Sequence, residues 1–230
     1  RYTIDLGVDP LKDGMLFAIA NSKLDGNLDG NVDIKHSNYI VNTGILNDGS
    51  GWDIRVQDNQ TNHSQTGIDK DFSFVYIPYD TKHLWGGRYD GVPGLNGVGT
   101  LDGIGTVGDG AGSFTMERLG VGEYQLHIPG RTPKTGMLLL NVAYNRGAAP
   151  DDNILTYQLD EDENGFFIIK SHDIEYEDPL DPDSVQLSPQ DTVFSWAYID
   201  FDEPIEAPLL LGGVDEPGFL SITGGGSFTT

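Results

Sequence analysis

The chain has 230 residues, and its 13 lysines and arginines stand against 36 aspartates and glutamates, which gives a formal net charge of −23. A surface this negative repels phosphate backbones and anionic lipids and attracts divalent cations, so we expect no nucleic-acid partner and no electrostatic attachment to a membrane. The sequence has no cysteine and no apolar run of about 18 residues, which excludes disulfides and thiolate chemistry and argues against membrane insertion.

Strand signals recur along the chain, whereas helical spacing of apolar residues is not sustained in any window of about 11 residues. Short runs that alternate or stay apolar are separated by clusters of Gly, Pro, Asn and Asp. In chain order the predicted strands cover residues 72–79, 84–89, 113–118, 124–128, 137–143, 154–159 and 166–171. These strands predict an all-β fold built of immunoglobulin-like β-sandwiches, with a jelly-roll as the alternative.

The inward positions of these strands supply a candidate core. Its expected members are Phe72, Phe74, Tyr76, Phe114, Leu126, Ile128, Leu138, Leu140, Phe167 and Ile169. Each of the three tryptophans, Trp52, Trp85 and Trp196, falls on or beside such an apolar position. We therefore expect the tryptophans to pack in the core rather than to form a sugar-stacking platform.

Two copies of a repeat are visible in the sequence. At an offset of 122 residues (124 − 2), segments 2–6, 12–16 and 72–80 match segments 124–128, 134–138 and 194–202. Segment 52–56 matches 167–171 at an offset of 115 (167 − 52), and segments 84–87 and 112–115 match 210–213 and 226–229. The shared order of the blocks predicts tandem repeats of about 120 residues, with the chain ends cut within repeats.

This phase predicts three segments. Residues 1–66 carry the late strands of a first β-sandwich repeat, residues 67–186 form a complete repeat, and residues 187–230 carry the early strands of a further repeat. The polar stretches 57–70 and 175–190 are interpreted as connections between repeats. The early strands of 187–230 would complete residues 1–66 either in the same chain or in a neighbouring chain.

The segment Asp25–Asp33 has the spacing of a calcium loop. Oxygen-bearing side chains alternate along it and Gly30 supplies the bend, so the expected metal ligands are Asp25, Asn27, Asp29, Asn31 and Asp33, with Asn31 contributing its carbonyl. The segment resembles the calcium loops of dockerins and thrombospondin type 3 repeats, which implies calcium as the cofactor. It departs from them at position 12 of the loop, where His36 replaces the bidentate acid, and a solvated turn is the alternative.

Catalytic patterns are missing from the sequence. It has no Gly-x-Ser-x-Gly, His-Glu-x-x-His or Walker motif, and the glycine motif at residues 103–108 has no strand–turn–helix context. A second acidic cluster, residues 160–165, is interpreted as a solvated hairpin tip. We therefore expect a protein that is not an enzyme, without catalytic residues or an organic cofactor.

The strand Phe72–Pro78 and the motif Gly122–Gly130 resemble repeats of large secreted bacterial surface proteins and adhesins. The resemblance implies an extracellular, cell-surface structural protein that builds a fibre, stalk or surface layer by self-association or as a longer tandem array. Head-to-tail strand complementation, stiffened by calcium, would serve this assembly. The alternative is a carbohydrate-binding or adhesive module with a glycan partner.

Overall fold

The protein is described by a computed structural model that covers residues 2–10, 12–20, 39–46, 48–58, 66–67, 72–79, 84–89, 114–144, 153–159, 166–176, 185–201, 210–215, 219–223 and 227–229. Every regular element in these residues is a β-strand, which confirms the predicted all-β class. The described residues contain no helix of the length and apolarity needed to cross a membrane.

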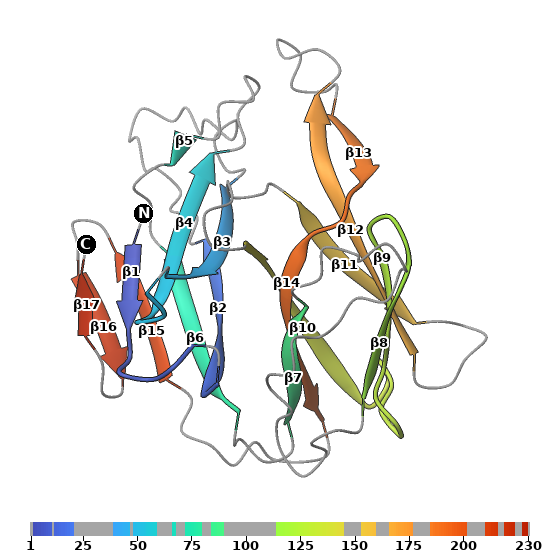
Figure 1. Cartoon of the computed structure of the whole chain (residues 1–230), viewed down its shortest axis with the longest axis horizontal. Helices are drawn as coiled ribbons and strands as arrows, with labels where there is room; N and C mark the ends of the chain where they lie inside the picture. Colours follow the sequence, from blue (N-terminus) through green and yellow to red (C-terminus); the bar gives the residue numbers. More distant parts are fainter. Residues whose placement is uncertain are drawn as a thin grey trace, which may run out of the picture.

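The strands fall into two groups that we call the first block and the second block (Figure 1). The first block contains β1 (Tyr2–Asp5), β2 (Gly14–Ala20), β3 (Tyr39–Ile45), β4 (Trp52–Asp58), β5 (Thr66–Gly67), β6 (Phe72–Pro78), β15 (Leu210–Asp215), β16 (Phe219–Thr223) and β17 (Ser227–Thr229). The second block contains β7 (Leu84–Tyr89), β8 (Thr115–Gly120), β9 (Glu123–His127), β10 (Gly136–Tyr144), β11 (Ile154–Leu159), β12 (Phe166–Tyr176), β13 (Val185–Pro189) and β14 (Val193–Asp200).

Three sheets build the two blocks. An eight-stranded sheet has the order β17-β1-β4-β3-β10-β14-β7, with β5 paired to β4, and therefore runs through both blocks. In the first block it faces a four-stranded sheet, β16-β15-β6-β2, and in the second block a five-stranded sheet, β11-β12-β9-β8 with β13 paired to β12. The blocks are joined within the large sheet by a parallel pair of β3 and β10, in which Thr43 lies opposite Ala143 and Gly44 opposite Tyr144.

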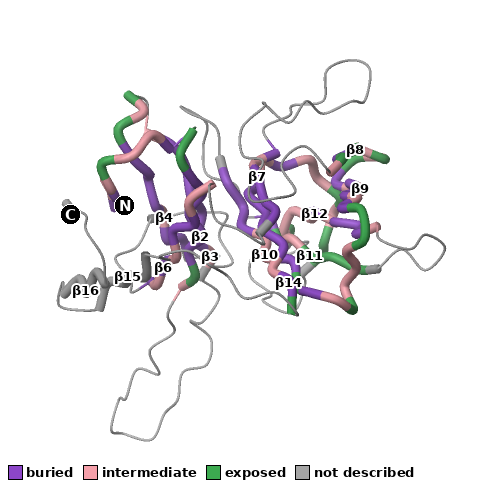
Figure 2. Tube along the Cα trace, turned by 90° about the horizontal axis from the view of Figure 1, so that it is seen from below, coloured by how far each residue is buried: buried purple, intermediate pink, exposed green. Residues whose placement is uncertain are grey.

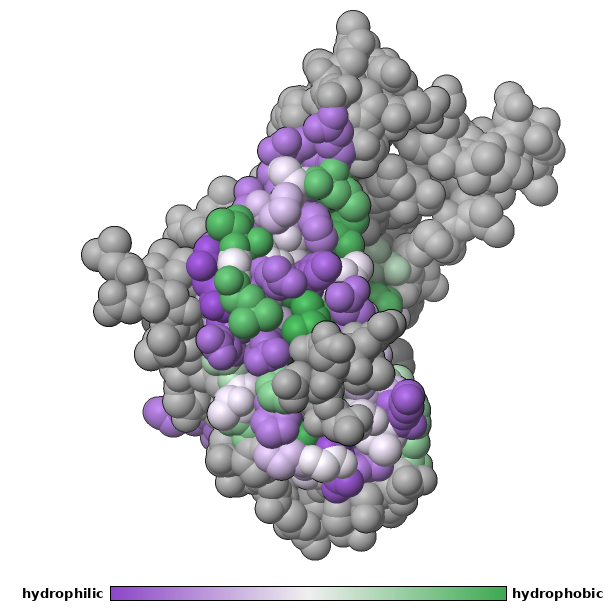
Figure 3. Space-filling view, turned by 90° about the vertical axis from the view of Figure 1, so that its right-hand side faces the viewer, coloured by the Kyte–Doolittle hydropathy of each residue, from purple (hydrophilic) through white to green (hydrophobic). Residues whose placement is uncertain are grey.

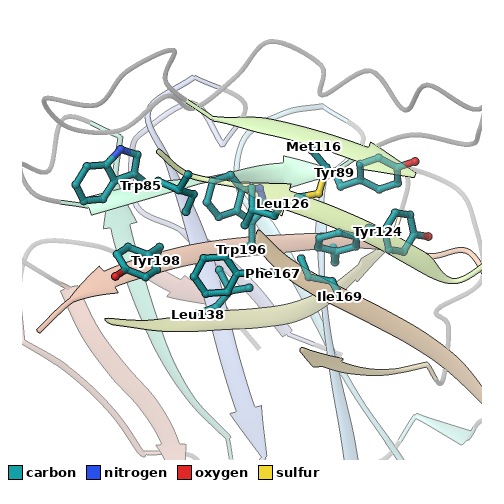
Figure 4. Close-up of a cluster of buried hydrophobic side chains, with 12 residues drawn as sticks. Trp85, Tyr89, Met116, Tyr124, Leu126, Leu138, Phe167, Ile169, Trp196 and Tyr198 are labelled. Carbon is teal, nitrogen blue, oxygen red and sulfur yellow. The ribbon is translucent and has the colours of Figure 1, made fainter. Parts of the chain in front are cut away.

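Each block has its own apolar core (Figure 2). The first core packs β1, β2, β3, β4 and β6 around buried side chains that include Trp52 and Phe72, and the second packs β7 to β10, β12 and β14 around Trp85, Phe167 and Trp196 (Figure 4). The three tryptophans are buried, as the sequence predicts. Of the predicted core residues only Phe114 and Leu140 are partly exposed, and both still pack against the second core.

The two blocks use the same strand registers. In the first block Met15 lies opposite Ile77, and in the second Met137 lies opposite Ile199, so both residues of the pair shift by 122. The same holds for Tyr2 with Ile54 and Tyr124 with Ile169, where the two residues shift by 122 and 115. Since these are the offsets of the sequence repeat, β1, β2, β4 and β6 correspond to β9, β10, β12 and β14. The partners of β4 and β12 add a fifth equivalence, of β3 with β11.

The register differs from the sequence match at β7 and β15. Trp85 pairs with Tyr198 and Leu210 with Tyr76, so Leu210 takes the place of Trp85 and the structural offset is 125 rather than 126. A shift of one residue turns every side chain of a strand to the other face. Aligning the Gly-Gly pairs of the two sequences does not detect such a shift. The stretch 175–190, interpreted as a connection, also contains β13, which pairs with β12.

The chain crosses between the blocks twice. β6 packs in the first core and β14 in the second. The predicted repeats instead group β6 with the strands of residues 67–186 and β14 with those of residues 187–230. β15, β16 and β17 then return to the first block, where β17 pairs with β1 and β15 with β6. The strands of residues 1–66 thus have partners within the same chain. The repeat boundaries themselves stay a prediction.

Candidate functional site: the junction between the two blocks

A buried apolar junction lies between the two blocks. The outer face of β2 and β6 packs on the outer face of β10 and β14, opposite the faces that line the two cores. The buried members are Met15, Phe17, Ile77 and Ala197, and Val75, Tyr79, Leu139 and Ile199 pack around them. Burial raises the pKa of the Tyr79 phenol to about 12, with a smaller opposing effect of Arg88. The buried side chains of the junction thus form a third apolar cluster beside the two cores.

Equivalent faces of the two blocks meet at this junction. By the shared registers, Phe17, Val75 and Ile77 of the first block correspond to Leu139, Ala197 and Ile199 of the second. The contact is not two-fold symmetric, because Met15 is 2% exposed at the junction whereas its counterpart Met137 is 38% exposed. The junction therefore pairs the two blocks through equivalent faces in a non-equivalent arrangement.

A small-residue hollow in the second block receives Met15. Gly86 of β7 lies opposite Ala197 of β14, and because both residues are small they leave space above the sheet. A Cβ on Gly86 would overlap the Met15 methyl group and lie 3.0 Å from the Met15 Sδ. Met15 is only 2% exposed, so its thioether fills the hollow.

Asn141 is a polar centre beside the apolar contact. It is 7% exposed, its Oδ1 accepts a hydrogen bond from the Ala18 amide at 3.2 Å, and its Nδ2 donates to Thr43 Oγ1 at 3.0 Å. The amide group thus links β10 to β2, the end strand of its sheet, and to β3, the strand that pairs with β10. Its register counterpart in the first block is Ile19, which is 69% exposed. The blocks therefore differ where a specific polar contact between them is made.

A second polar cluster lies at one end of the second block. Asp191 accepts hydrogen bonds from Arg118 Nε at 2.9 Å and Nη2 at 2.8 Å, from the Gly122 amide at 3.0 Å and from the Tyr124 hydroxyl at 3.1 Å. Burial acts to raise the pKa of Asp191, but these hydrogen bonds outweigh it and the pKa is lowered. The Tyr124 hydroxyl also accepts from the Thr192 amide at 3.1 Å. Because these groups satisfy one another, the cluster pins the β8–β9 hairpin to the start of β14 rather than offering an open site.

On the outer face of the five-stranded sheet, Ile168 is buried, and the neighbouring His127 and Phe166 are half-buried. Figure 3, which views the right-hand side of Figure 1, shows apolar and polar side chains interleaved on this face. His127 and Phe166 are opposite each other on β9 and β12, and their rings stack with centroids 4.5 Å apart. Ile154 of β11 and Leu187 of β13 are exposed large apolar residues in the same sheet.

The predicted metal ligands Asp25, Asn27, Asp29, Asn31 and Asp33 lie outside the described residues, as do His36 and the acidic cluster 160–165. Among the residues that the structure does describe, no group of three or more His, Cys, Asp and Glu is placed to hold a metal ion. The calcium site thus stays a prediction from the sequence.

The junction itself was missed by the sequence reasoning. The sequence feature that indicates it is the apolar run Met15–Ile19, which does not alternate with polar residues as a half-exposed strand does. In the structure this strand is buried on both faces as far as Ala18. The strand Val193–Asp200 shows the same burial on both faces. Such runs indicate strands that are buried on both faces, but they do not identify the element that packs on each face.

No known protein family, curated protein or solved structure matches the chain. The junction can hold the two blocks in one fixed orientation.

Proposed function

We propose that the chain is an extracellular structural protein of tandem immunoglobulin-like β-sandwich repeats. In this proposal the first and second blocks are two repeats locked into one rigid unit, and such units build a fibre, stalk or surface layer. The observation that carries the proposal is the pairing of two blocks with one strand plan through a buried junction. Domains linked only by a flexible connection move freely by default, whereas a large apolar contact fixes their orientation. Fixed orientation is what a load-bearing or spacing element requires.

The acidic, cysteine-free composition supports the same role. A net charge of −23 keeps a long array soluble and attracts divalent cations, and the proposed calcium loop at residues 25–33 would use them to stiffen the first block. Because the junction already buries these faces against each other within the chain, self-association would use other surfaces, such as sheet edges. Edge strands present unpaired backbone groups and readily accept another strand, which is the physical basis of head-to-tail complementation.

Electron microscopy of the native material, with the intact mass measured on the same sample, tests the proposal. Filaments, regular layers or stalks with a spacing of paired blocks are the expected result, whether the polymer is covalent or assembled. Discrete particles that show neither polymer nor attachment to a cell surface would contradict it.

A carbohydrate-binding or adhesive module is the second candidate. It is favoured by the outer face of the five-stranded sheet, where the His127 and Phe166 rings stack and Gln125 stands two positions before His127 on the same strand. Aromatic faces flanked by amides suit the apolar and hydroxyl surfaces of sugars. Binding on a glycan array that is lost in Phe166→Ala and kept in Leu187→Ala would support this function, and an empty array would remove it.

A further inference from the structure

Two strands complete each block, and they take the same positions in both. In the second block β7 pairs with β14 and β8 pairs with β9. In the first block β15 pairs with β6 and β17 pairs with β1. Since β6 and β1 are the register counterparts of β14 and β9, β15 and β17 hold the places of β7 and β8. We call these four strands the closing strands.

The closing strands of each block follow the other block in the chain. β7 and β8 come after β6, which belongs to the first block, yet they complete the second block. β15 and β17 come after β14, which belongs to the second block, and they complete the first. The two blocks thus supply closing strands to each other, which is the arrangement that two copies adopt in domain swapping.

The two blocks differ in how a closing strand is held beside its partner. β8 and β9 form a hairpin whose turn is Val121 and Gly122, so a short connection keeps these strands together. In the first block Thr229 of β17 lies opposite Thr3 of β1, at a separation of 226 residues (229 − 3). No local turn holds β17 to β1, and their pairing depends on the fold of the whole chain.

The first block of a second copy offers the same two edges to β15 and β17. The ladder of residues 210–214 with 72–76 and the ladder of residues 227–229 with 3–5 would form again with the same partners. The junction would stay intact, because its described members lie on β2, β6, β10 and β14 and at Tyr79. Pairing between copies therefore competes with pairing within a copy, and the closed copy is favoured by an effective concentration on the order of 1 mM.

We propose that β15, β16 and β17 form an exchangeable segment that completes the first block of a second copy of this chain and so joins copies head to tail. Closure of the segment within one copy is then the resting form that holds assembly in check. The inference rests on the proposed function and specifies the donor and acceptor strands of the assembly. Because each copy has a net charge of −23, repulsion opposes the exchange and added salt promotes it.

The test uses the full chain, which has no cysteine of its own. Thr3→Cys and Thr229→Cys are made in separate copies, mixed at about 1 mM, unfolded in urea, refolded together and oxidised. Opposite residues of an antiparallel pair lie within disulfide range, and in this mixture a bond from position 3 to position 229 forms only between copies. Mass spectrometry of the linked peptides identifies the bond.

The matched control is a mixture of Glu117→Cys and Gln125→Cys. These residues lie opposite each other on β8 and β9, and Gln125 is the register counterpart of Thr3. The hairpin keeps the two strands in one copy, so a bond from position 117 to position 125 reports only chance collisions between copies. Ser73→Cys and Gly213→Cys, opposite each other on β6 and β15, give the same test if the first pair does not fold.

We expect the bond between positions 3 and 229 to be about tenfold or more as abundant as the control bond, and to increase with protein concentration and with salt. It appears in a dimer of 50.0 kDa (2 × 25.0). The double variant Thr3→Cys with Thr229→Cys, oxidised at high dilution, is expected to be linked within the copy and to stay at 25.0 kDa.

The inference is overturned if the bond between positions 3 and 229 does not form between copies, or if the control bond forms in equal yield. Electron microscopy of the dilute, oxidised double variant separates the inference from the proposed function. Filaments or layers built from copies locked in the closed form would overturn the inference and leave the proposed function standing. A bond between positions 3 and 229 in material that shows only discrete particles would support the inference and contradict the proposed function.

Discussion

The hollow that receives Met15 makes Gly86 a sensitive position. In Gly86→Ala the new methyl group would overlap the end of the Met15 side chain and lie 2.9 Å from the Trp196 carbonyl oxygen. Carbon atoms in good contact are about 3.5–4.0 Å apart, so Met15 must leave its place and β7 must shift slightly from β14. Overpacking of this kind costs about 1–3 kcal/mol of the free energy of unfolding.

The reverse change, Met15→Ala, empties the hollow. Met15 is 2% exposed, and truncation of a buried methionine to alanine costs about 2–5 kcal/mol through lost transfer energy and a residual cavity. In the double variant the alanine at position 86 occupies space that the methionine has left. We expect the double variant to be more stable than the sum of the single effects by about 1 kcal/mol, with rescue incomplete because the contact with the Trp196 carbonyl remains.

Urea unfolding followed by tryptophan fluorescence gives the three free energies. Gly120→Ala serves as the control, because a Cβ at Gly120 has its nearest neighbour, Glu123 Oε2, 4.0 Å away, and we expect a change within about 0.5 kcal/mol. Additivity of Gly86→Ala and Met15→Ala within about 0.5 kcal/mol would refute a direct contact between these two residues, and with it the geometry of the junction.

Three further predictions concern the polar groups. Asp191→Asn should cost about 3 kcal/mol at neutral pH because Arg118 loses its charged partner. Since the pKa of Asp191 is lowered by folding, its stabilisation is complete above the ordinary value of 3.8 and is lost as the pH falls below it, so the gap between wild type and variant should close in acid. Asn141→Leu should cost about 1–3 kcal/mol in urea unfolding, because the Ala18 amide is left buried without its acceptor. If the loop at residues 25–33 binds calcium, chelation should lower the melting temperature of the wild type, and Asp29→Ala should abolish that difference.

Each of these has an outcome that contradicts it. A difference in stability between the wild type and Asp191→Asn that stays constant with pH would show that the carboxylate charge is not the cause. For Asn141, the counterpart Ile19→Asn on an exposed position is the control, and equal losses in both variants would show that the amide makes no specific contact. A melting curve of the wild type that is the same with and without chelator would remove the calcium site.

Much of the block architecture is encoded locally. The strand at residues 123–127, Glu-Tyr-Gln-Leu-His, alternates polar and apolar side chains along its whole length, and this period of two marks both the strand and its inward face. The match of Tyr2 with Tyr124 and of Trp52 with Phe167 predicts which ladders recur, and the observed registers carry the same offsets. Burial of Trp52, Trp85 and Trp196 follows from the same positions.

The candidate site depends on contacts that no local pattern contains. Phe17 and Leu139 lie on apolar runs that indicate strands buried on both faces. Any apolar surface could bury the outer face of such a strand, so the run does not identify the partner. Asn141 and Ile19 hold the same strand position, yet one is buried in a hydrogen-bonded contact and the other is exposed. Residue type and periodicity thus determined the strands and their inward faces, because these follow from backbone geometry and the separation of apolar from polar side chains. Which outer faces meet, and which strand joins which core, was decided only in the tertiary structure, because that choice rests on shape and hydrogen bonds between residues far apart in the chain, such as Ala18 and Asn141 with a separation of 123.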